Sequence, residues 1–193
     1  MARRKGLTFY QKKKKLNMNL IKEIFSWIFW IFASMLFAVV VVFCVGMKTS
    51  VIGPSMEPSL YNGQEIYLDR IVYRVSQPKF GDVVVFLPNG NEKSHYYVKR
   101  VVGVPGDKLK IKGGKLYVNE VAVEEFFNDK IAEAGLLENE LTLKEDEYFV
   151  IGDNCNNSED SRSANIGCVK KDYMIGKAWF KMALNDSELG FVE

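Results

Sequence analysis

The sequence predicts a mainly β protein that is preceded by one transmembrane helix. Three features support this: a run of 23 residues without a charge at 24–46, later segments in which apolar and polar residues alternate, and Gly-containing turns between those segments. The chain has 193 residues, of which 48% are hydrophobic and 13% aromatic. That composition fits one ordinary folded domain and a membrane element, rather than a disordered chain.

The apolar run at residues 24–46 is long enough to cross a bilayer. A helix of that length rises about 35 Å, and the hydrocarbon core is about 30 Å thick. A cleavable secretory signal has a shorter apolar core of roughly 7–15 residues that ends at a small-x-small site, and residues 45–49 offer no such site. We therefore expect a retained transmembrane anchor.

The charges on either side of this run predict its orientation. Residues 1–23 contain eight basic residues and one acidic residue, Glu23, so the positive-inside rule places them in the cytoplasm. Residues 24–193 contain 18 basic and 23 acidic residues, a formal charge of −5. No basic face with interleaved aromatic residues follows the basic segment, so nucleic acid is not an expected partner. The predicted parts are a basic cytoplasmic segment (1–23), a signal anchor (24–46) and an extracytoplasmic domain (47–193).

The outer domain is predicted to consist of strands joined by turns. Alternating or short apolar segments indicate strands at residues 65–73, 82–87, 96–104, 147–153 and 175–180. Residues 109–118 are expected to form a hairpin that turns at two consecutive glycines. One short helix is expected at residues 129–139.

Ser55 lies nine residues after the apolar run, in a turn that contains Gly53 and Pro54. A serine hydroxyl needs a neighbouring base to accept its proton before it can attack a carbonyl. Lys99 interrupts the apolar segment 96–104, and burial there would lower its pKa from about 10.4, so that it could be neutral. Two alternatives remain open: Lys99 points to solvent, as most strand lysines do, or His95, the single histidine, serves Ser55 in a Ser-His-Asp triad.

Residues 152–162 form a third polar segment. Its Gly, Asp, Asn and Ser residues are typical of an ordinary turn. The functional alternative is that Ser158 orients the amine of Lys99 while Asp160 and Arg162 brace the loop as an ion pair.

The cysteines and the single histidine add few constraints. Cys155 and Cys168 could form a disulfide in an extracytoplasmic domain or remain free thiols, and the sequence leaves both open. These residues lack the spacing of metal ligands, so neither a metal nor an organic cofactor is expected.

Several blocks of sequence resemble the type I signal peptidases, particularly the small Gram-positive-type enzymes with one N-terminal anchor. They are residues 53–60, 81–86, 97–107, 152–154, 157–162 and 175–178. The resemblance implies a signal-peptidase/LexA-like β fold of coiled antiparallel sheets. We expect a small inserted subdomain at about residues 106–148.

The resemblance also implies roles for individual residues. Ser55 would be the nucleophile and Lys99 the general base, with Ser158 positioning the lysine amine and Asp160 and Arg162 supporting the loop. The backbone N–H of Ser55 would hold the oxyanion.

Two single positions depart from the family pattern, and residues 165–167 depart from its usual aromatic-Gly spacing after Ser161 and Arg162. Members of the family often carry a hydroxyl residue, a second oxyanion donor, where this chain has Gly53, and usually an arginine where it has Cys155.

The function that the resemblance implies is a membrane-bound serine endopeptidase that removes N-terminal signal peptides at small-x-small sites such as Ala-x-Ala. Its partners would be secretory preproteins and membrane lipid. The pockets for the small residues would be lined by Val51, Ile52, Tyr97 and Val98.

Two other functions compete with this one. A LexA-type self-cleaving repressor would need an N-terminal DNA-binding domain, and this chain begins with a basic segment and an apolar span. In a membrane-anchored, non-catalytic β binding module, Ser55 and Lys99 would be dispensable.

Overall fold

The structure, a computed structural model, describes residues 18–127, 129–184 and 187–192. It divides into two units, Met1–Val40 and Val41–Glu193, which we describe separately. Most of the basic segment predicted at residues 1–23 lies outside the described residues.

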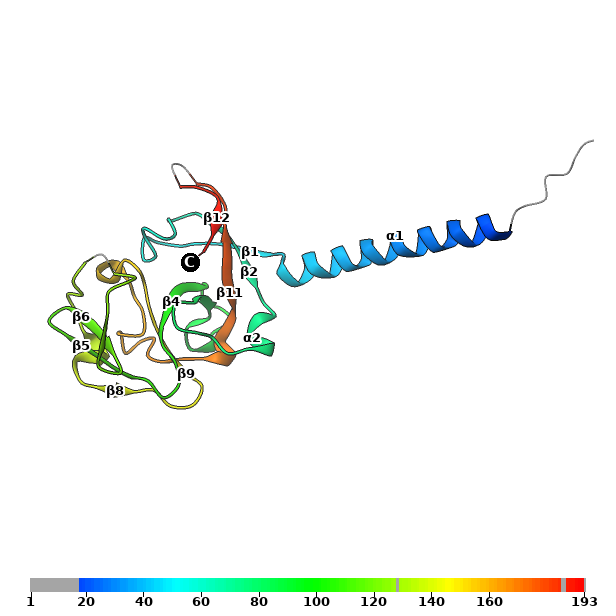
Figure 1. The fold of residues 1–193 in the computed structure, drawn as a ribbon. Coiled ribbons are helices and arrows are strands. Elements are labelled where there is room, and N and C mark those ends of the chain that lie inside the picture. The colour runs from blue at the N-terminus through cyan, green and yellow to red at the C-terminus, as the bar shows by residue number, and fades with distance from the viewer. Residues whose placement is uncertain (1–17, 128, 185–186, 193) are drawn as a thin grey trace, which may run out of the picture. The chain divides into compact units, whose positions relative to one another are not determined.

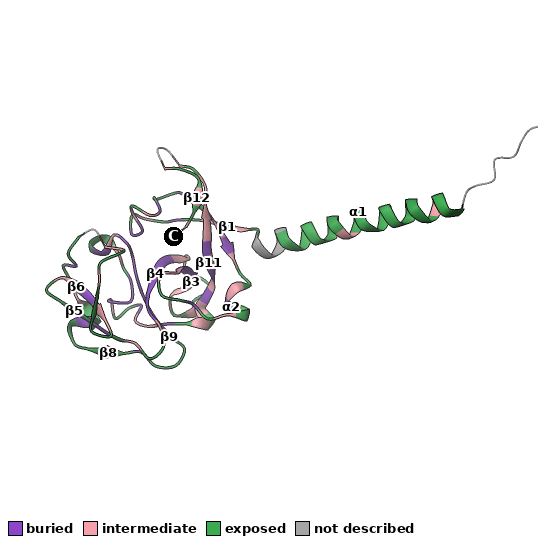
Figure 2. Cartoon of the chain, viewed as in Figure 1, coloured by how far each residue is buried: buried purple, intermediate pink, exposed green. Residues whose placement is uncertain are grey.

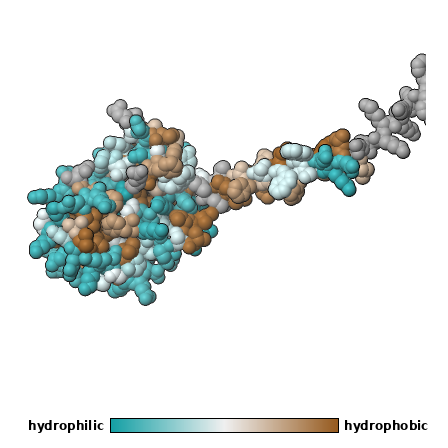
Figure 3. Space-filling model, in the orientation of Figure 1, coloured by the Kyte–Doolittle hydropathy of each residue, from teal (hydrophilic) through white to brown (hydrophobic). Residues whose placement is uncertain are grey.

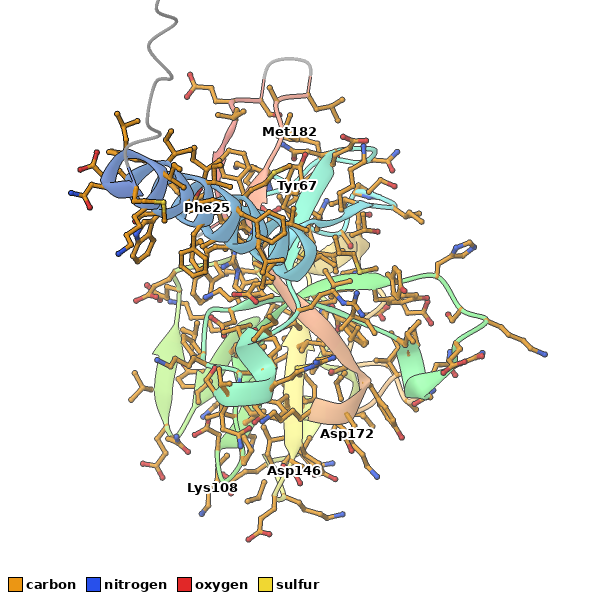
Figure 4. All side chains as sticks on the ribbon, turned by 90° about the vertical axis from the view of Figure 1, so that its right-hand side faces the viewer. Phe25, Tyr67, Lys108, Asp146, Asp172 and Met182 are labelled. Atoms are coloured by element: carbon orange, nitrogen blue, oxygen red, sulfur yellow. The ribbon has the colours of Figure 1, made fainter. Side chains whose placement is uncertain are left out.

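The long helix α1 (Met18–Val45) accounts for the described part of the first unit (Figure 1). Its segment Met18–Val41 is long and apolar enough to cross a membrane, and none of its most apolar window is buried by protein. Figure 3 shows the apolar residues along it, and Figure 4 shows side chains such as Phe25 projecting from it. The helix begins before Ile24 because Lys22 and Glu23 are good helix formers and extend it beyond the apolar run.

An eight-stranded sheet forms the main part of the second unit, and every pair of neighbouring strands is antiparallel. This confirms the prediction of a mainly β fold. The strands, in spatial order, are β1 (Met47–Ser50), β2 (Glu65–Asp69), β11 (Met174–Lys181), β3 (Val83–Phe86), β4 (Tyr97–Gly103), β9 (Glu147–Ile151) and β10 (Val169–Lys170), with β12 (Gly190–Phe191) paired to β11.

A second, four-stranded sheet is inserted in the chain between β4 and β9. Its spatial order is β7 (Val121–Val123), β6 (Lys115–Val118), β5 (Lys108–Lys112) and β8 (Leu141–Thr142). Strands β5 and β6 form the predicted hairpin, in which Gly113 and Gly114 adopt positive φ angles of 62° and 79°. Side chains on the outer face of β5, such as Lys108, point to solvent (Figure 4).

The core explains why β3 has a continuous apolar sequence. Val83 and Val85 pack into one hydrophobic cluster, whereas Val84 and Phe86 pack into another. All four residues are buried, as Figure 2 shows for the centre of the sheet. A strand covered on both faces loses the alternation that a half-exposed strand shows.

A third cluster joins the small sheet to the main one. Leu109 and Leu116 from the small sheet pack with Phe149 and Ile151 from β9. Cys155 is buried in the same cluster, so the small sheet and the segment after β9 share one core.

Two sequence predictions of local structure were wrong. The helix expected at residues 129–139 is only the 3₁₀ turn Gly135–Glu138, which begins at a glycine with φ of 55°. The strand expected at 65–73 ends at Asp69, whose Oδ1 accepts hydrogen bonds from the N–H groups of Ile71 and Val72 at 2.9 and 3.0 Å. That local bonding starts the short helix α2 (Val72–Val75) in place of a longer strand.

Three further 3₁₀ turns complete the described elements. They are η1 (Pro88–Gly90), η3 (Cys155–Asn157) and η4 (Lys171–Tyr173).

Candidate active site

Ser55 lies in the connection between β1 and β2. The pairing of these strands continues past their ends, because Val51 N donates to Gln64 O at 2.9 Å and Gly63 N donates to Val51 O at 2.8 Å. Gly53, with φ of 83°, then turns the chain, and its N–H donates to Asn62 Oδ1 at 2.9 Å. Apolar side chains that follow Ser55, including the fully buried Met56 and Leu60, fix the turn in the core.

Strand β4 brings Lys99 to Ser55, 44 residues away in the sequence. Lys99 Nζ lies 2.5 Å from Ser55 Oγ, and the two residues are only 4% and 8% exposed. The alternative in which Lys99 points to solvent is therefore wrong. His95 precedes β4 and is exposed, and the hydrogen-bond partner of the Ser55 hydroxyl is Lys99.

Burial lowers the pKa of Lys99 to about 8, because the charged ammonium loses its hydration. The carboxylates of Asp160 and Glu159 act in the opposite direction, but burial is the larger cause. A lysine with this pKa is substantially neutral in mildly alkaline solution, so it can accept a proton.

Gly152 allows the loop after β9 to approach the Ser55 turn closely. A Cβ atom built on Gly152 would lie 2.3 Å from Ser55 O and 2.4 Å from Ser158 Oγ, so no other residue fits there without a shift. Asn154 fastens the contact, with its backbone N donating to Ser55 O at 3.0 Å and its Nδ2 donating to Pro54 O at 3.2 Å.

Ser158 therefore lies beside the turn that carries Ser55. Its hydroxyl oxygen is buried and has no hydrogen-bond partner among the described residues. The structure thus places Ser158 near the nucleophile but does not contain the expected hydrogen bond to Lys99.

Asp160 and Arg162 form the ion pair that the sequence suggested. Arg162 donates from Nε to Asp160 Oδ1 at 2.8 Å and from Nη2 to Asp160 Oδ2 at 2.9 Å. Asp160 is completely buried and also accepts a hydrogen bond from Gly152 N at 3.2 Å. The pair therefore holds the glycine that contacts the Ser55 turn.

A second buried ion pair, between Arg100 and Asp153, was not predicted. Arg100 donates from Nε and Nη2 to the two carboxylate oxygens of Asp153, at 2.8 and 2.7 Å. Its guanidinium also donates to Gly81 O at 2.9 Å and lies 4.4 Å from the centre of the Phe126 ring. The only sequence signal was an arginine inside an apolar strand, which must be paired if the strand is buried.

The four residues predicted around the substrate pockets differ in exposure. Val51 and Val98 are buried in the same hydrophobic cluster as Met56, next to Ser55 in the sequence. Tyr97 is partly buried, its ring centre lies 5.7 Å from Lys99 Nζ, and its hydroxyl donates to Glu159 Oε2 at 3.1 Å. Ile52 is 62% exposed.

Two backbone edges near Ser55 and Lys99 lack strand partners. Among the described residues, the N–H and C=O of Ile52 make no hydrogen bond, although its neighbour Val51 is paired to residues 63 and 64. Strand β4 pairs with β3 from Tyr97 onward, but its pairing with β9 on the other edge begins only at Arg100. Edges of this kind can accept an extended peptide as an additional strand.

The cysteines of the outer unit are free thiols in the structure. Cys155 is buried and Cys168 partly buried, and burial raises the pKa of both. Among the described residues, no three His, Cys, Asp or Glu side chains come together as a possible metal site.

Comparison with known proteins identifies the family. Residues 24–183 match the family model described as signal peptidase, peptidase S26. A signal peptidase I P from Bacillus subtilis subsp. natto is 34% identical over 179 residues, covering 86% of this chain and 91% of the relative. A signal peptidase IB from Staphylococcus aureus strain COL is 33% identical over 180 residues, covering 83% and 90%.

A solved structure is also similar. The crystal structure of a signal peptidase I from Enterococcus faecalis V583 aligns with a TM-score of 0.44 and 27% sequence identity, covering 53% of this chain and 97% of that chain. The family match covers residues 24–183, a range that contains both Ser55 and Lys99, and the two relatives match 86% and 83% of this chain. The chain therefore belongs to the signal peptidase family, peptidase S26, and is a serine peptidase.

Proposed function

We propose that this chain is a membrane-bound signal peptidase I that cleaves secretory preproteins after small-x-small sequences, with Ser55 as nucleophile and Lys99 as general base. The observation that carries the proposal is the 2.5 Å separation of Lys99 Nζ and Ser55 Oγ, with both residues buried. The relatives named above, which are signal peptidases, support the same reaction.

The acylation step follows from this geometry. Neutral Lys99 takes the hydroxyl proton as Ser55 Oγ attacks the scissile carbonyl carbon. The Ser55 N–H donates no hydrogen bond among the described residues, so it is available for the oxyanion. Gly53 supplies no side-chain donor, which leaves this N–H as the protein donor that we assign to that role.

The later steps use the same lysine. Protonated Lys99 gives its proton to the amine of the mature protein as the peptide bond breaks, leaving the signal peptide esterified to Ser55. Lys99 then takes a proton from water as the water attacks the ester, and Ser55 recovers its proton when the signal peptide leaves as a carboxylate. Ser158 would keep the lysine amine oriented toward the reacting groups during these proton transfers.

Substrate binding would use the two unpaired backbone edges. The residues before the cleavage site would lie extended between Ile52 and Tyr97–Lys99, where main-chain hydrogen bonds supply affinity. Val51 and Val98 are already packed in the core, so the pockets that we assign to them would be shallow and would favour small side chains.

The anchor would place this reaction at the membrane. Helix α1 has the length and composition of a transmembrane segment, and we assign residues 1–23 to the cytoplasm and residues 47–193 to the opposite side. The signal peptide of a preprotein would occupy the same bilayer as this helix, so the anchor and membrane lipid would bring enzyme and substrate together.

The inserted sheet lies within the subdomain that we assign to about residues 106–148.

The proposal is tested with full-length protein in lipid nanodiscs and a synthetic precursor that carries an Ala-x-Ala site. Wild-type protein should cleave it, and Ser55→Ala and Lys99→Ala should each abolish cleavage. Ser50→Ala and Lys110→Ala are matched controls, because both residues are exposed, and they should cleave normally. Full activity of folded Ser55→Ala and Lys99→Ala proteins would reject the dyad, and absence of wild-type cleavage would favour a non-catalytic binding module.

A further inference from the structure

The segment at residues 130–137, which we call the strap, connects the inserted sheet to the loop that carries Ser158 and Asp160. The strap lies in the chain between β7 and β8. Two of its apolar side chains, Ile131 and Leu137, are 4% and 0% exposed and pack in the cluster that contains Cys155. Ile131 N also donates to Gly114 O at 2.9 Å, so the strap is fixed to the β5–β6 hairpin.

Four hydrogen bonds join the strap to residues 156 and 162 of the loop. The Asn156 amide makes two of them: Oδ1 accepts from Ala132 N at 2.9 Å, and Nδ2 donates to Lys130 O at 3.0 Å. Arg162 makes the other two: Nη1 donates to Glu133 O at 3.2 Å, and its carbonyl oxygen accepts from Leu136 N at 2.9 Å. The bonds hold the loop on both sides of Ser158 and Asp160.

Gly135 brings the backbones of strap and loop into direct contact. A Cβ atom built on it would lie 2.3 Å from Arg162 O and 2.9 Å from Arg162 C. These two nearest atoms belong to the backbone, so a larger residue would have to displace the loop or the strap. A positive φ of 55° further favours glycine here.

Arg162 transmits this contact toward Ser55. It donates to both carboxylate oxygens of Asp160, and Asp160 accepts the N–H of Gly152, the glycine packed against Ser55 O. A hollow of about 330 Å³ remains between strap and loop, lined in part by Glu133 and Ser158. The hydrogen bonds around this hollow, together with the apolar cluster shared by Ile131, Leu137 and Cys155, hold the loop in position.

We propose that the strap positions the loop against Ser55 and Lys99, and that Gly135 and Asn156 are positioning residues for the peptidase reaction. This inference rests on the proposed function, because it assigns a role within that reaction. The inserted four-stranded sheet then acts as the support on which the strap is built. Among the described residues, neither Gly135 nor Asn156 makes a hydrogen bond to the backbone edges at Ile52 and Tyr97–Lys99, so the proposal concerns the chemical step rather than substrate binding.

The experiment compares Gly135→Ala with Gly113→Ala in the full-length enzyme. Gly113 has a similar positive φ of 62°, but a Cβ atom there would meet nothing within 4 Å. Both substitutions therefore place a side chain at a similar positive φ, and only Gly135→Ala also displaces the loop.

We expect Gly135→Ala to lower kcat by roughly 10- to 100-fold, as small misplacements of catalytic groups do, while KM stays near its wild-type value. Gly113→Ala should keep both constants. A folded Gly135→Ala enzyme with wild-type kcat, or equal losses of kcat in the two variants, would overturn the proposal.

Asn156→Ala provides a second measurement if Gly135→Ala does not fold. It removes two hydrogen bonds between strap and loop without adding atoms, and kcat should fall about 3- to 10-fold because the loop is held less firmly beside Ser55. The matched control is Asn139→Ala, an exposed asparagine in the same inserted region. Equal kcat in these two variants contradicts the proposal. Failure of the wild-type enzyme to cleave would reject the proposed function itself. Wild-type cleavage together with unchanged kcat in Gly135→Ala and Asn156→Ala would reject only the positioning role of the strap.

Discussion

The two sides of the candidate active site are held mainly by different kinds of interaction. The turn that carries Ser55 is fixed by apolar packing, with Met56 and Leu60 fully buried behind it. The loop that carries Ser158 is fixed by the buried Asp160–Arg162 ion pair and by hydrogen bonds to the strap. Apolar packing tolerates changes of charge and pH but not of volume, whereas a buried ion pair fails when either partner is lost. The two sides should therefore respond to different perturbations.

Asp160→Ala should give the largest effect and should damage the loop side. It leaves the Arg162 guanidinium buried without its carboxylate, which costs about 3–5 kcal/mol in the free energy of unfolding. Urea unfolding of the full-length protein measures this loss. Glu65→Ala is the control, because it breaks only the exposed pair with Lys48 and should cost no more than about 1 kcal/mol. Similar losses in the two variants would show that the buried pair does not hold the loop.

Leu60→Ala should damage the turn side by about 2–5 kcal/mol, through lost apolar contacts and the cavity left behind. No charged group changes, so the dependence of cleavage on pH should match that of the wild type. The two measurements are urea unfolding and a pH profile of kcat/KM. A displaced acid limb in this variant would contradict the separation between the two sides.

Lys99 comes from β4 and belongs to neither the Ser55 turn nor the Ser158 loop. A change of pH should change its protonation directly. Its pKa is lowered to about 8 by burial, and only the neutral amine can act as a base. Cleavage measured as kcat/KM should therefore fall about tenfold per pH unit as pH decreases below 8. The same profile should be found in Gly113→Ala, which leaves the surroundings of Lys99 unchanged. A profile that stays flat between pH 8 and pH 6 would exclude Lys99 as the base.

Local patterns in the sequence predicted the fold class well, because they report on features that depend on near neighbours. The β5–β6 hairpin was predicted from two glycines between alternating segments, and β3 from a short apolar run. The helix expected at residues 129–139 failed because Ile131 and Leu137 anchor a strap rather than one face of a helix. Their apolar character was visible in the sequence, but the surface against which they pack was not.

The candidate site was predicted from spacing and from family resemblance, and the structure adds what those could not show. The 2.5 Å contact of Lys99 with Ser55 joins strand β4 to the turn between β1 and β2. The Arg100–Asp153 pair was missed because nothing in the sequence relates an arginine in one strand to an aspartate 53 residues later. The bonds of Asn156 to the strap were missed for the same reason, since they depend on how the inserted sheet meets the loop.

The adjacent positions of Lys99 and Arg100 on β4 also constrain how the protein folds. Successive residues of a strand point to opposite faces, and here one cation meets Ser55 while the next meets Asp153. A slip of β4 by one residue that put Arg100 in the place of Lys99 would bring a guanidinium, which stays charged at every physiological pH, to the serine. The same slip would leave Asp153 buried without its arginine partner. The order of these two residues therefore disfavours the shifted register of β4. Only the correct pairing of this strand brings a base that can be neutral to Ser55.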